Sequence, residues 1–467
     1  MRRTYDRAIA GFDLRRAWVW SLLLLVCIPL FPEYIAPFLA VAAFLFARRD
    51  ARLNGRRVRV GAVGKVLVAY LCFMLVHLLW ATDRAFSAFS WLYWAMMLTA
   101  YLALTTVLTS RHRVETTLFT LSTIVGMLGT LACAQYACNA ILHIDVLPLQ
   151  LWDFVDEQVY SLVNVPVHLH SVGFRSGATF SNPNLFAQFL VMAIPFVAAY
   201  GFTGQRSAAK IFSRIALVLG VAGLCVTFSR GAYLALLSIA IVMCIANIRR
   251  LVPMLMVAFS TILLLPDTVY ARLSSMADSS DVAILERFSV WGITMQVFLK
   301  RPLFGHGIGV GTIMDALSSH GYAAPHAHNV FLEFLVEGGA IGLLILLFLL
   351  WKCFRTGFEL IIQTPRSRMY GAAVIAFCAG FCVNGMFDHL LFTPKPIGMF
   401  MMAAALTDAF GFLTLTRPSC SFAQAVPFWP ALSERIESWV KKKTAPKEDV
   451  PAPKQDAPAE EKETETV

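Results

Sequence analysis

Charged residues divide the chain into apolar blocks of about 17–24 residues, the length that a helix needs to cross the hydrocarbon of a bilayer. Apolar residues make up 58% of the 467 residues, and charged residues only 15%. A soluble chain of this composition could not cover its surface with polar side chains. The sequence also lacks the short alternating segments of a transmembrane barrel. It therefore predicts an all-α polytopic membrane protein.

About twelve transmembrane helices can be placed on these blocks. The first block follows a basic segment, as a secretory signal would, but residues 31–33 lead directly into a second apolar block. We therefore expect an uncleaved first span. The predicted spans are 17–32, 33–47, 63–80, 86–108, 115–142, 180–201, 211–228, 231–247, 251–266, 328–351, 370–391 and 394–415.

The distribution of basic residues predicts the orientation of the membrane domain, 17–415. With residues 1–16 in the cytoplasm, the short loops that are rich in Lys and Arg fall on the cytoplasmic side, as the positive-inside rule requires. Residues 416–467 then form a cytoplasmic tail, mostly disordered because its end is rich in Pro, Lys and Glu. Two long loops, about 143–179 and 267–327, lie on the outer side, the second of them before the tenth span.

Composition argues against two other classes of protein. The net charge of +10 would suit a nucleic-acid partner, but the basic residues lie in short loops rather than on one face of a folded domain. We therefore expect no nucleic-acid partner. Twelve spans would also suit a transporter, yet no internal repeat is evident, and the charge expected at a working site is concentrated near the outer surface.

The stretch Pro325–Trp351 joins a polar cluster to a membrane-length apolar helix. His326 and His328 precede the apolar residues, and Glu333 and Glu337 lie within the first half of the span. Ionisable groups in a span are costly and usually face a protein interior or a wet cavity, so they indicate function. We expect His328 to open the helix, whose positive end favours a neutral imidazole that can act as a general base.

Two other interpretations of these histidines stay open. His328 could be a packing histidine at the membrane interface. Alternatively, His326 and His328 could join His168 and His170 in a metal site, although no cysteine or regularly spaced acidic residue supports this. We expect no metal, and the sequence does not decide which of His326 and His328 acts.

Arginines on the outer side form a second group of candidates. Arg175 precedes Asn182 and Pro183, which fit an N-cap and a first helical position, so that helix would offer anion-binding N–H groups beside it. Arg230 lies at a tight hairpin between two spans, and Arg287 lies in the longer outer loop. Because a guanidinium binds two phosphate oxygens at once, these residues predict an anion clamp. Each arginine could instead reach the interface or pair with an acidic loop residue.

The longer outer loop also contains a predicted helix at the membrane surface, Ile284–Lys300, with apolar residues on one stripe. Pro302 ends this helix, and the glycines of Gly305–Gly311 predict a flexible turn rather than a dinucleotide fingerprint. Asp388 and His389, near the outer end of the eleventh span, are further candidates for the same cavity.

Five segments of the chain form a recognisable series. They are TFSNPNLFAQF (179–189), FSRGAYLAL (228–236), RFSVW (287–291), RPLFGHGIGV (301–310) and AHNVFLEFLVEGGAIGLL (327–344). This series resembles the O-antigen ligase/polymerase superfamily, whose members are bacterial inner-membrane proteins that transfer glycans from undecaprenyl diphosphate. The resemblance extends over residues 170–415, in the same order and with a long outer loop before the histidines.

The resemblance implies a GT-C-like glycosyltransferase in the inner membrane, with a periplasmic active site that inverts the anomeric carbon without a metal or cofactor. Its partners would be membrane lipids, a donor glycan linked to undecaprenyl diphosphate, and an acceptor sugar. Lipid A–core is the expected acceptor, which describes an O-antigen ligase. A repeat-unit polymerase of O-antigen or exopolysaccharide, or a protein O-oligosaccharyltransferase, would show the same segments.

The resemblance also implies roles for individual residues. Arg230 and Arg287 match the SRG and RxxxW motifs, and His328 matches the histidine before asparagine, so these three would be catalytic. Arg175 matches more loosely an arginine that precedes the NPN segment. The residues implied at the diphosphate are Arg175, Arg230, Arg287 and Asn182, and the further candidates are His326, Glu333 and Asp388.

Overall fold

The computed structural model describes residues 17–139, 175–204, 206–246, 282–309, 311–322, 324–365 and 367–421. These residues belong to one compact unit. The predictions for the N-terminal segment, for the span 251–266, for most of the first outer loop and for the tail after residue 421 lie outside the described residues. His168 and His170 lie outside them as well.

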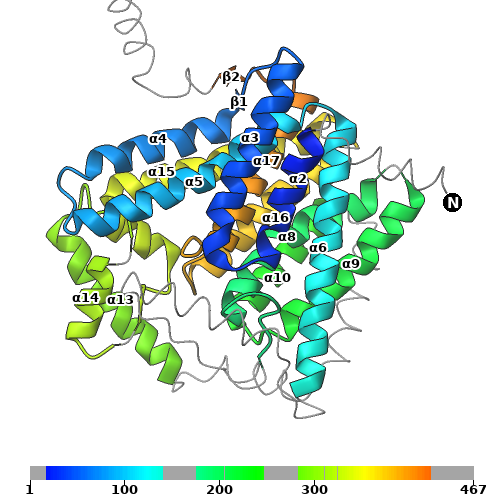
Figure 1. Cartoon of the computed structure of the whole chain (residues 1–467). Helices are drawn as coiled ribbons and strands as arrows, with labels where there is room; N and C mark the ends of the chain where they lie inside the picture. Colours follow the sequence, from blue (N-terminus) through cyan, green and yellow to red (C-terminus); the bar gives the residue numbers. More distant parts are fainter. Residues whose placement is uncertain are drawn as a thin grey trace, which may run out of the picture. The chain divides into compact units, whose positions relative to one another are not determined.

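Helices form nearly all of the described secondary structure (Figure 1). Within the described residues, seven helices are long and apolar enough to cross a membrane, and three shorter apolar helices accompany them. These helices confirm an all-α polytopic membrane protein. The helices are α2 (Ala17–Cys27), α3 (Ala36–Leu53), α4 (Ala62–His77), α5 (Arg84–Val107), α6 (Arg111–Ala137), α8 (Pro183–Thr203), α9 (Ser207–Cys225), α10 (Arg230–Ala246), α13 (Val282–Lys300), α14 (Gly311–Ser319), α15 (Val330–Gln363), α16 (Arg368–Gly385) and α17 (Pro394–Thr414).

Each predicted span that falls within the described residues coincides with a helix. The first two are joined by two short 3-10 turns, η1 (Ile28–Leu30) and η2 (Glu33–Ile35), where Pro29 and Pro32 lack the amides that an α-helix needs. One strand pair is present in the described part of the chain. It joins β1 (Arg59–Val60) to β2 (Cys420–Ser421) in antiparallel register.

The expectation that His328 opens the tenth span is wrong by two residues. The helix α15 begins at Val330, and the side chain of Asn329 is its N-cap. The amides of Phe331 and Leu332 donate to Asn329 Oδ1 at 2.9 and 3.2 Å. His328 has a φ of 50°, in the left-handed region, so it belongs to the turn before the helix.

A backbone break at Gly339 divides α15, because its φ of 65° and ψ of −164° are not helical. The loop 302–307 lies in this break. Two of its amides donate to carbonyls before the break, and two of its carbonyls accept from amides after it. The helix therefore bends without leaving these buried backbone groups unpaired. The four pairs are His306–Val336 (2.8 Å), Gly307–Glu337 (3.0 Å), Ala340–Pro302 (2.8 Å) and Ile341–Leu303 (3.3 Å).

The predicted outer-loop helix is present as α13, and α14 packs against it (Figure 1). The two helices enclose a small apolar cluster of their own. Val336 of α15 closes that cluster, which fixes α13 to the span that follows the histidines. The cluster consists of Val290, Ile293, Val297, Ile313, Leu317 and Val336.

Close helix packing brings the remaining elements of the site together. α10 packs on α16, which in turn packs on α8 and α15. Gly231 in the first turn of α10 allows this contact, since a Cβ there would lie 2.8 Å from Cβ of Phe387. Small residues at such crossings let helix backbones approach closely.

Candidate functional site

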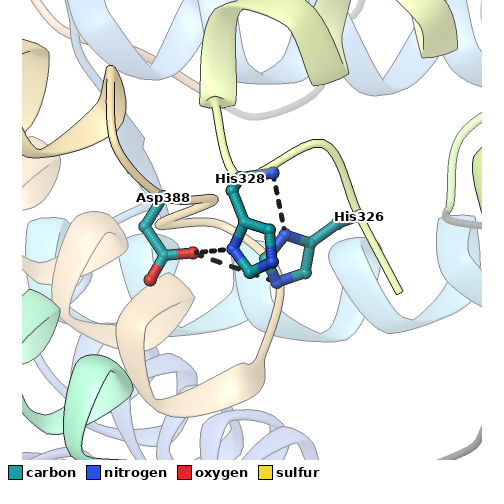
Figure 2. Close-up of side chains that lie close together, drawn as sticks. All are labelled: His326, His328 and Asp388. Carbon is teal, nitrogen blue, oxygen red and sulfur yellow. Dashed lines mark hydrogen bonds and ion pairs between the residues drawn. The ribbon is translucent and has the colours of Figure 1, made fainter. Parts of the chain in front are cut away.

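His328 and Asp388 form a hydrogen-bonded pair between two loops (Figure 2). Nδ1 of His328 lies 3.3 Å from Oδ1 of Asp388. Because a carboxylate only accepts, Nδ1 carries the proton and Nε2 is left as the basic atom. The His328 side chain is 30% exposed and that of Asp388 11%, so solvent reaches the imidazole more than its partner.

His326 lies beside this pair but has a different environment. The backbone amide of His328 donates to Nδ1 of His326 at 3.1 Å, which leaves the proton of a neutral ring on Nε2. That Nε2 lies 3.9 Å from Oδ1 of Asp388. Burial first, and then the electrostatic effect of His328, lower the pKa of His326 well below its usual value, and Arg287 contributes in the same direction.

Asp388 comes from the turn between α16 and α17, and its carboxylate also accepts the amide of His389 at 2.9 Å. Burial alone would raise the pKa of Asp388. The hydrogen bond from His328, and then the electrostatic effects of His328 and His326, outweigh burial and lower that pKa below its ordinary value. The aspartate is therefore a stable anion that orients the two imidazoles.

Arg175 is attached to the hairpin that precedes Arg230. Its Nε donates to the carbonyl of Thr227 at 2.7 Å, and its Nη2 bonds to Asn184 in the first turn of α8. The amide of the next residue, Ser176, donates to Val226 at 3.0 Å. The structure thus brings the loop of Arg175 and the hairpin of Arg230 into direct contact.

Arg230 and Arg287 lie next to residues that contact the histidine–aspartate group. Arg230 precedes Gly231, which packs against Phe387, the neighbour of Asp388. Nε1 of Trp291, one turn after Arg287 on α13, donates to the carbonyl of Ala327, between the two histidines, at 3.0 Å. The three predicted arginines and the two histidines of this turn therefore lie on elements that contact one another. Their roles stay predictions.

The expected cap of α8 is confirmed. Asn182 has extended backbone angles, Pro183 is the first helical residue, and the amide of Asn184 donates to Oδ1 of Asn182 at 2.8 Å. With its side chain used in this way, Asn182 shapes the helix N-terminus beside Arg175.

Gln135 of α6 was not among the predicted residues, although its buried side chain holds the Arg175 loop. Its Nε2 donates to the carbonyl of Ala178 at 2.9 Å, and its Oε1 accepts the amide of the same residue at 3.0 Å. Ala178 has a φ of 52°, and Phe228 beside Arg230 has a φ of 53°. Such strained backbone is common at functional sites. A glutamine within an apolar block was the signal that could have identified this residue.

Lys395 was also not predicted, although it is 1% exposed near the start of α17. Its Nζ donates to the carbonyl of Thr179 and lies 4.6 Å from the centre of the Phe180 ring. Ser181 donates to Oε1 of the buried Glu33 at 3.2 Å, and Lys395 acts electrostatically on the same carboxylate. These contacts fix the segment that leads into α8.

Two groups in the described residues have the donor atoms that a metal ion would need, each set lying within 4.8 Å of one another. The first is the histidine–aspartate group already described. The second lies on the adjacent turns of α15 and beside Asp388, and all its members are buried. The groups are His326, His328 and Asp388, and Glu333, Glu337 and His389.

Residues 215–347 match a protein-family model described as O-antigen ligase. The match confirms the resemblance to the O-antigen ligase/polymerase superfamily and supports, at the level of the family, a glycosyltransferase with glycan and lipid-linked substrates. No curated protein matches the chain.

The residues matched to the O-antigen ligase model include most of the site. Arg230, Arg287 and the two histidines fall within the matched residues, as do both glutamates of α15. Arg175, Asn182 and Asp388 lie outside them. The structure connects Arg175 to the 226–231 hairpin and Asp388 to His328, and Asn182 caps the helix whose first turn bonds to Arg175.

Proposed function

We propose that this protein is an O-antigen ligase, which transfers a preassembled glycan from undecaprenyl diphosphate to lipid A–core. The reaction takes place on the periplasmic face of the bacterial inner membrane, with both chain termini in the cytoplasm. The observation that supports this most is the His328–Asp388 pair beside the arginine-bearing hairpin 226–231, because His328 and the hairpin both fall within the residues matched to O-antigen ligases.

His328 is the general base in this proposal. Asp388 accepts a hydrogen bond from the Nδ1–H of His328, so the unprotonated Nε2 takes the proton from the acceptor hydroxyl. The oxygen then attacks the anomeric carbon while the bond from that carbon to the diphosphate oxygen breaks, and the electron pair leaves with undecaprenyl diphosphate. Attack from the face opposite the leaving group inverts the anomeric carbon.

The arginines stabilise the leaving group. Arg230, next to the glycine that packs on Phe387, and Arg287, one turn before the tryptophan bonded to the histidine turn, contact the diphosphate, whose negative charge grows as the C–O bond breaks. Arg175 has one nitrogen on Thr227 and one on Asn184, so it holds the hairpin while adding positive charge at the N-terminus of α8. Asn182 shapes that terminus.

His326 is a positioning residue in this proposal. Its Nδ1 accepts the amide of His328, which supports the left-handed turn, and its Nε2 faces Asp388. It is more buried than His328, with side-chain exposures of 9% and 30%. His328 is therefore the better of the two for contact with an acceptor hydroxyl.

The test is glycan transfer in vesicles that contain the purified full-length protein, the lipid-linked donor and lipid A–core. Arg287→Gln should reduce transfer by on the order of 10²-fold or more, because the transition state loses one charged donor. The matched control is Lys300→Gln, which removes an exposed cation from the same helix and should leave transfer unchanged. Equal transfer by both variants would contradict the clamp.

The same vesicles separate the ligase from the polymerase. A ligase requires lipid A–core and attaches whole glycans to it. If glycans instead lengthen on the lipid carrier when lipid A–core is omitted, the chain is a repeat-unit polymerase, and the ligase assignment is wrong.

A further inference from the structure

A second set of titratable side chains lies next to the histidine–aspartate pair. Glu333 and Glu337 are 0% and 5% exposed, and His389 is 3% exposed. The two glutamates are one turn apart on α15, so their carboxylates share one face of the helix. One donor atom from each of the three residues lies within 4.8 Å of the others.

Two polar atoms of this cluster that could bind a metal ion make no hydrogen bond in the described part of the chain. Oε2 of Glu333 accepts the amide of Ala327 at 2.9 Å, and Oε1 of Glu337 accepts the amide of Gly309 at 2.7 Å. Oε1 of Glu333 and Nδ1 of His389 are buried without a hydrogen-bond partner among the described residues. Orphaned buried polar atoms are costly, so they point to a bound species that pairs with them.

The chemistry of the three groups favours a cation as that species. Two carboxylates this close in a buried site repel each other unless a shared proton or a bound cation lies between them. In the described part of the chain, no ion pair joins the His389 imidazole to either carboxylate. One imidazole with two carboxylates is instead a donor set for Zn²⁺ or Mn²⁺.

We propose that Glu333, Glu337 and His389 bind one divalent transition-metal ion. The other candidate group is less suitable, because Asp388 Oδ1 is already bonded to His328 and Nδ1 of His326 already accepts an amide. The proposal goes beyond the proposed function and does not depend on it. The ion does not contact the reacting atoms.

The ion holds together the three segments on which the site depends. Glu333 is bonded to the turn of the two histidines, and Glu337 to the glycine loop that fills the break in α15. His389 belongs to the turn that contains Asp388. An ion between these side chains fixes the distance between the base and its aspartate.

The experiment measures metal in the full-length protein purified in detergent. The protein is treated with EDTA, desalted, incubated with ZnCl₂ or MnCl₂ and desalted again before elemental analysis. The wild type should retain one ion per chain, and the isosteric double variant Glu333→Gln/Glu337→Gln should lose it. His389→Gln should weaken binding by at least about 10-fold, the lower end of what is lost with one conserved metal-site partner.

Two variants serve as controls. His320→Ala/Asp315→Asn removes an exposed histidine and an exposed acid from the same outer loop and should retain the ion. His326→Asn should retain it as well. Loss of the ion in His326→Asn but not in the glutamate variant would assign the metal to the other group and overturn the proposal. Equal, substoichiometric metal in all proteins would overturn it too.

A second set of measurements uses only the wild type, so it tests the site even if the glutamate variant does not fold. Zn²⁺ or Mn²⁺ should raise the unfolding temperature of the EDTA-treated wild type, since an ion that binds only the folded state stabilises it. X-ray absorption of the zinc-loaded wild type should show one imidazole ligand. Absence of both the thermal shift and the imidazole signal would contradict the site.

Discussion

The carboxylate of Asp388 lies 3.3 Å from Nδ1 of His328, although 60 residues separate the two in the chain. His328 faces it from a left-handed backbone position with a φ of 50°. A non-glycine residue rarely adopts this conformation, and the cost of about 1–3 kcal/mol must be offset by contacts that hold it there. Two such contacts are the hydrogen bond from the backbone amide of His328 to Nδ1 of His326 and the hydrogen bond from the His328 ring to Asp388.

Replacing Asp388 by asparagine should impair transfer while preserving the shape of the turn. An amide in place of the carboxylate no longer stabilises the protonated imidazole or fixes its tautomer, so we expect the transfer rate to fall on the order of 10²-fold. The measurement is initial rate in donor-loaded vesicles. Asp315→Asn is the matched control, because Asp315 is exposed on α14, and its rate should equal that of the wild type. Equal rates for both variants would exclude the orienting role.

Replacing His328 by asparagine should lower the rate of glycan transfer far more than the same replacement of His326. Asparagine tolerates a positive φ better than alanine, so His328→Asn tests the imidazole with little backbone penalty. We expect His328→Asn to lower the maximal rate on the order of 10²–10⁴-fold, because the general base is lost.

His326→Asn retains an acceptor for the amide of His328 and should lower the rate less. It should also leave the pH profile of the remaining activity unchanged in shape, because its ring takes no proton from the acceptor. If His326→Asn abolishes transfer and His328→Asn does not, the assignment of the base is reversed.

Local sequence signals were enough to predict the helices and parts of the site. The cap at Asn182 and Pro183 depends on residues adjacent in the chain, and the helix α13 depends on apolar spacing. Both are confirmed because each element is determined mainly by its own residues.

The contacts between helices could not be predicted in the same way. The pairing of His328 with Asp388 depends on how α15, α16 and α17 pack, and no local pattern specifies it. Gln135 and Lys395 looked like isolated polar residues in apolar surroundings, but they fix the loop before α8. Polar residues inside apolar blocks deserve more weight than periodicity alone gives them.

Acidification should destabilise the protein through His306. Burial, and then the charges of Arg301 and Lys300, lower the pKa of His306 from its ordinary 6.5, so the folded state binds a proton less readily than the unfolded chain. The stability that His306 contributes is therefore complete above about pH 6.5 and is lost as the pH falls from there towards the lower folded pKa.

The measurement is the unfolding temperature in detergent between pH 8 and pH 5. His306→Gln should be less stable at pH 8, because the neutral ring bonds to Thr82 (3.0 Å) and Val297 (2.9 Å). It should also show a smaller loss on acidification than the wild type. His320→Gln, an exposed histidine on the same outer loop, should keep the wild-type slope. An unchanged slope in His306→Gln would contradict the assignment.

Replacing Gly339 by alanine should damage the break in α15. Its φ of 65° is unfavourable for any residue with a Cβ, which costs about 1–3 kcal/mol of folding free energy. The added Cβ would also lie 2.3 Å from the carbonyl of Leu303, which is backbone and cannot rotate away. The loop that pairs with the backbone at the break would be displaced, and transfer should fall together with the unfolding temperature.

Gly292→Ala is the control, because that glycine lies in α13 with nothing within 4 Å of an added Cβ. It should leave stability unchanged or raise it by up to about 1 kcal/mol. Equal unfolding temperatures for Gly339→Ala and the wild type would show that the break does not need glycine.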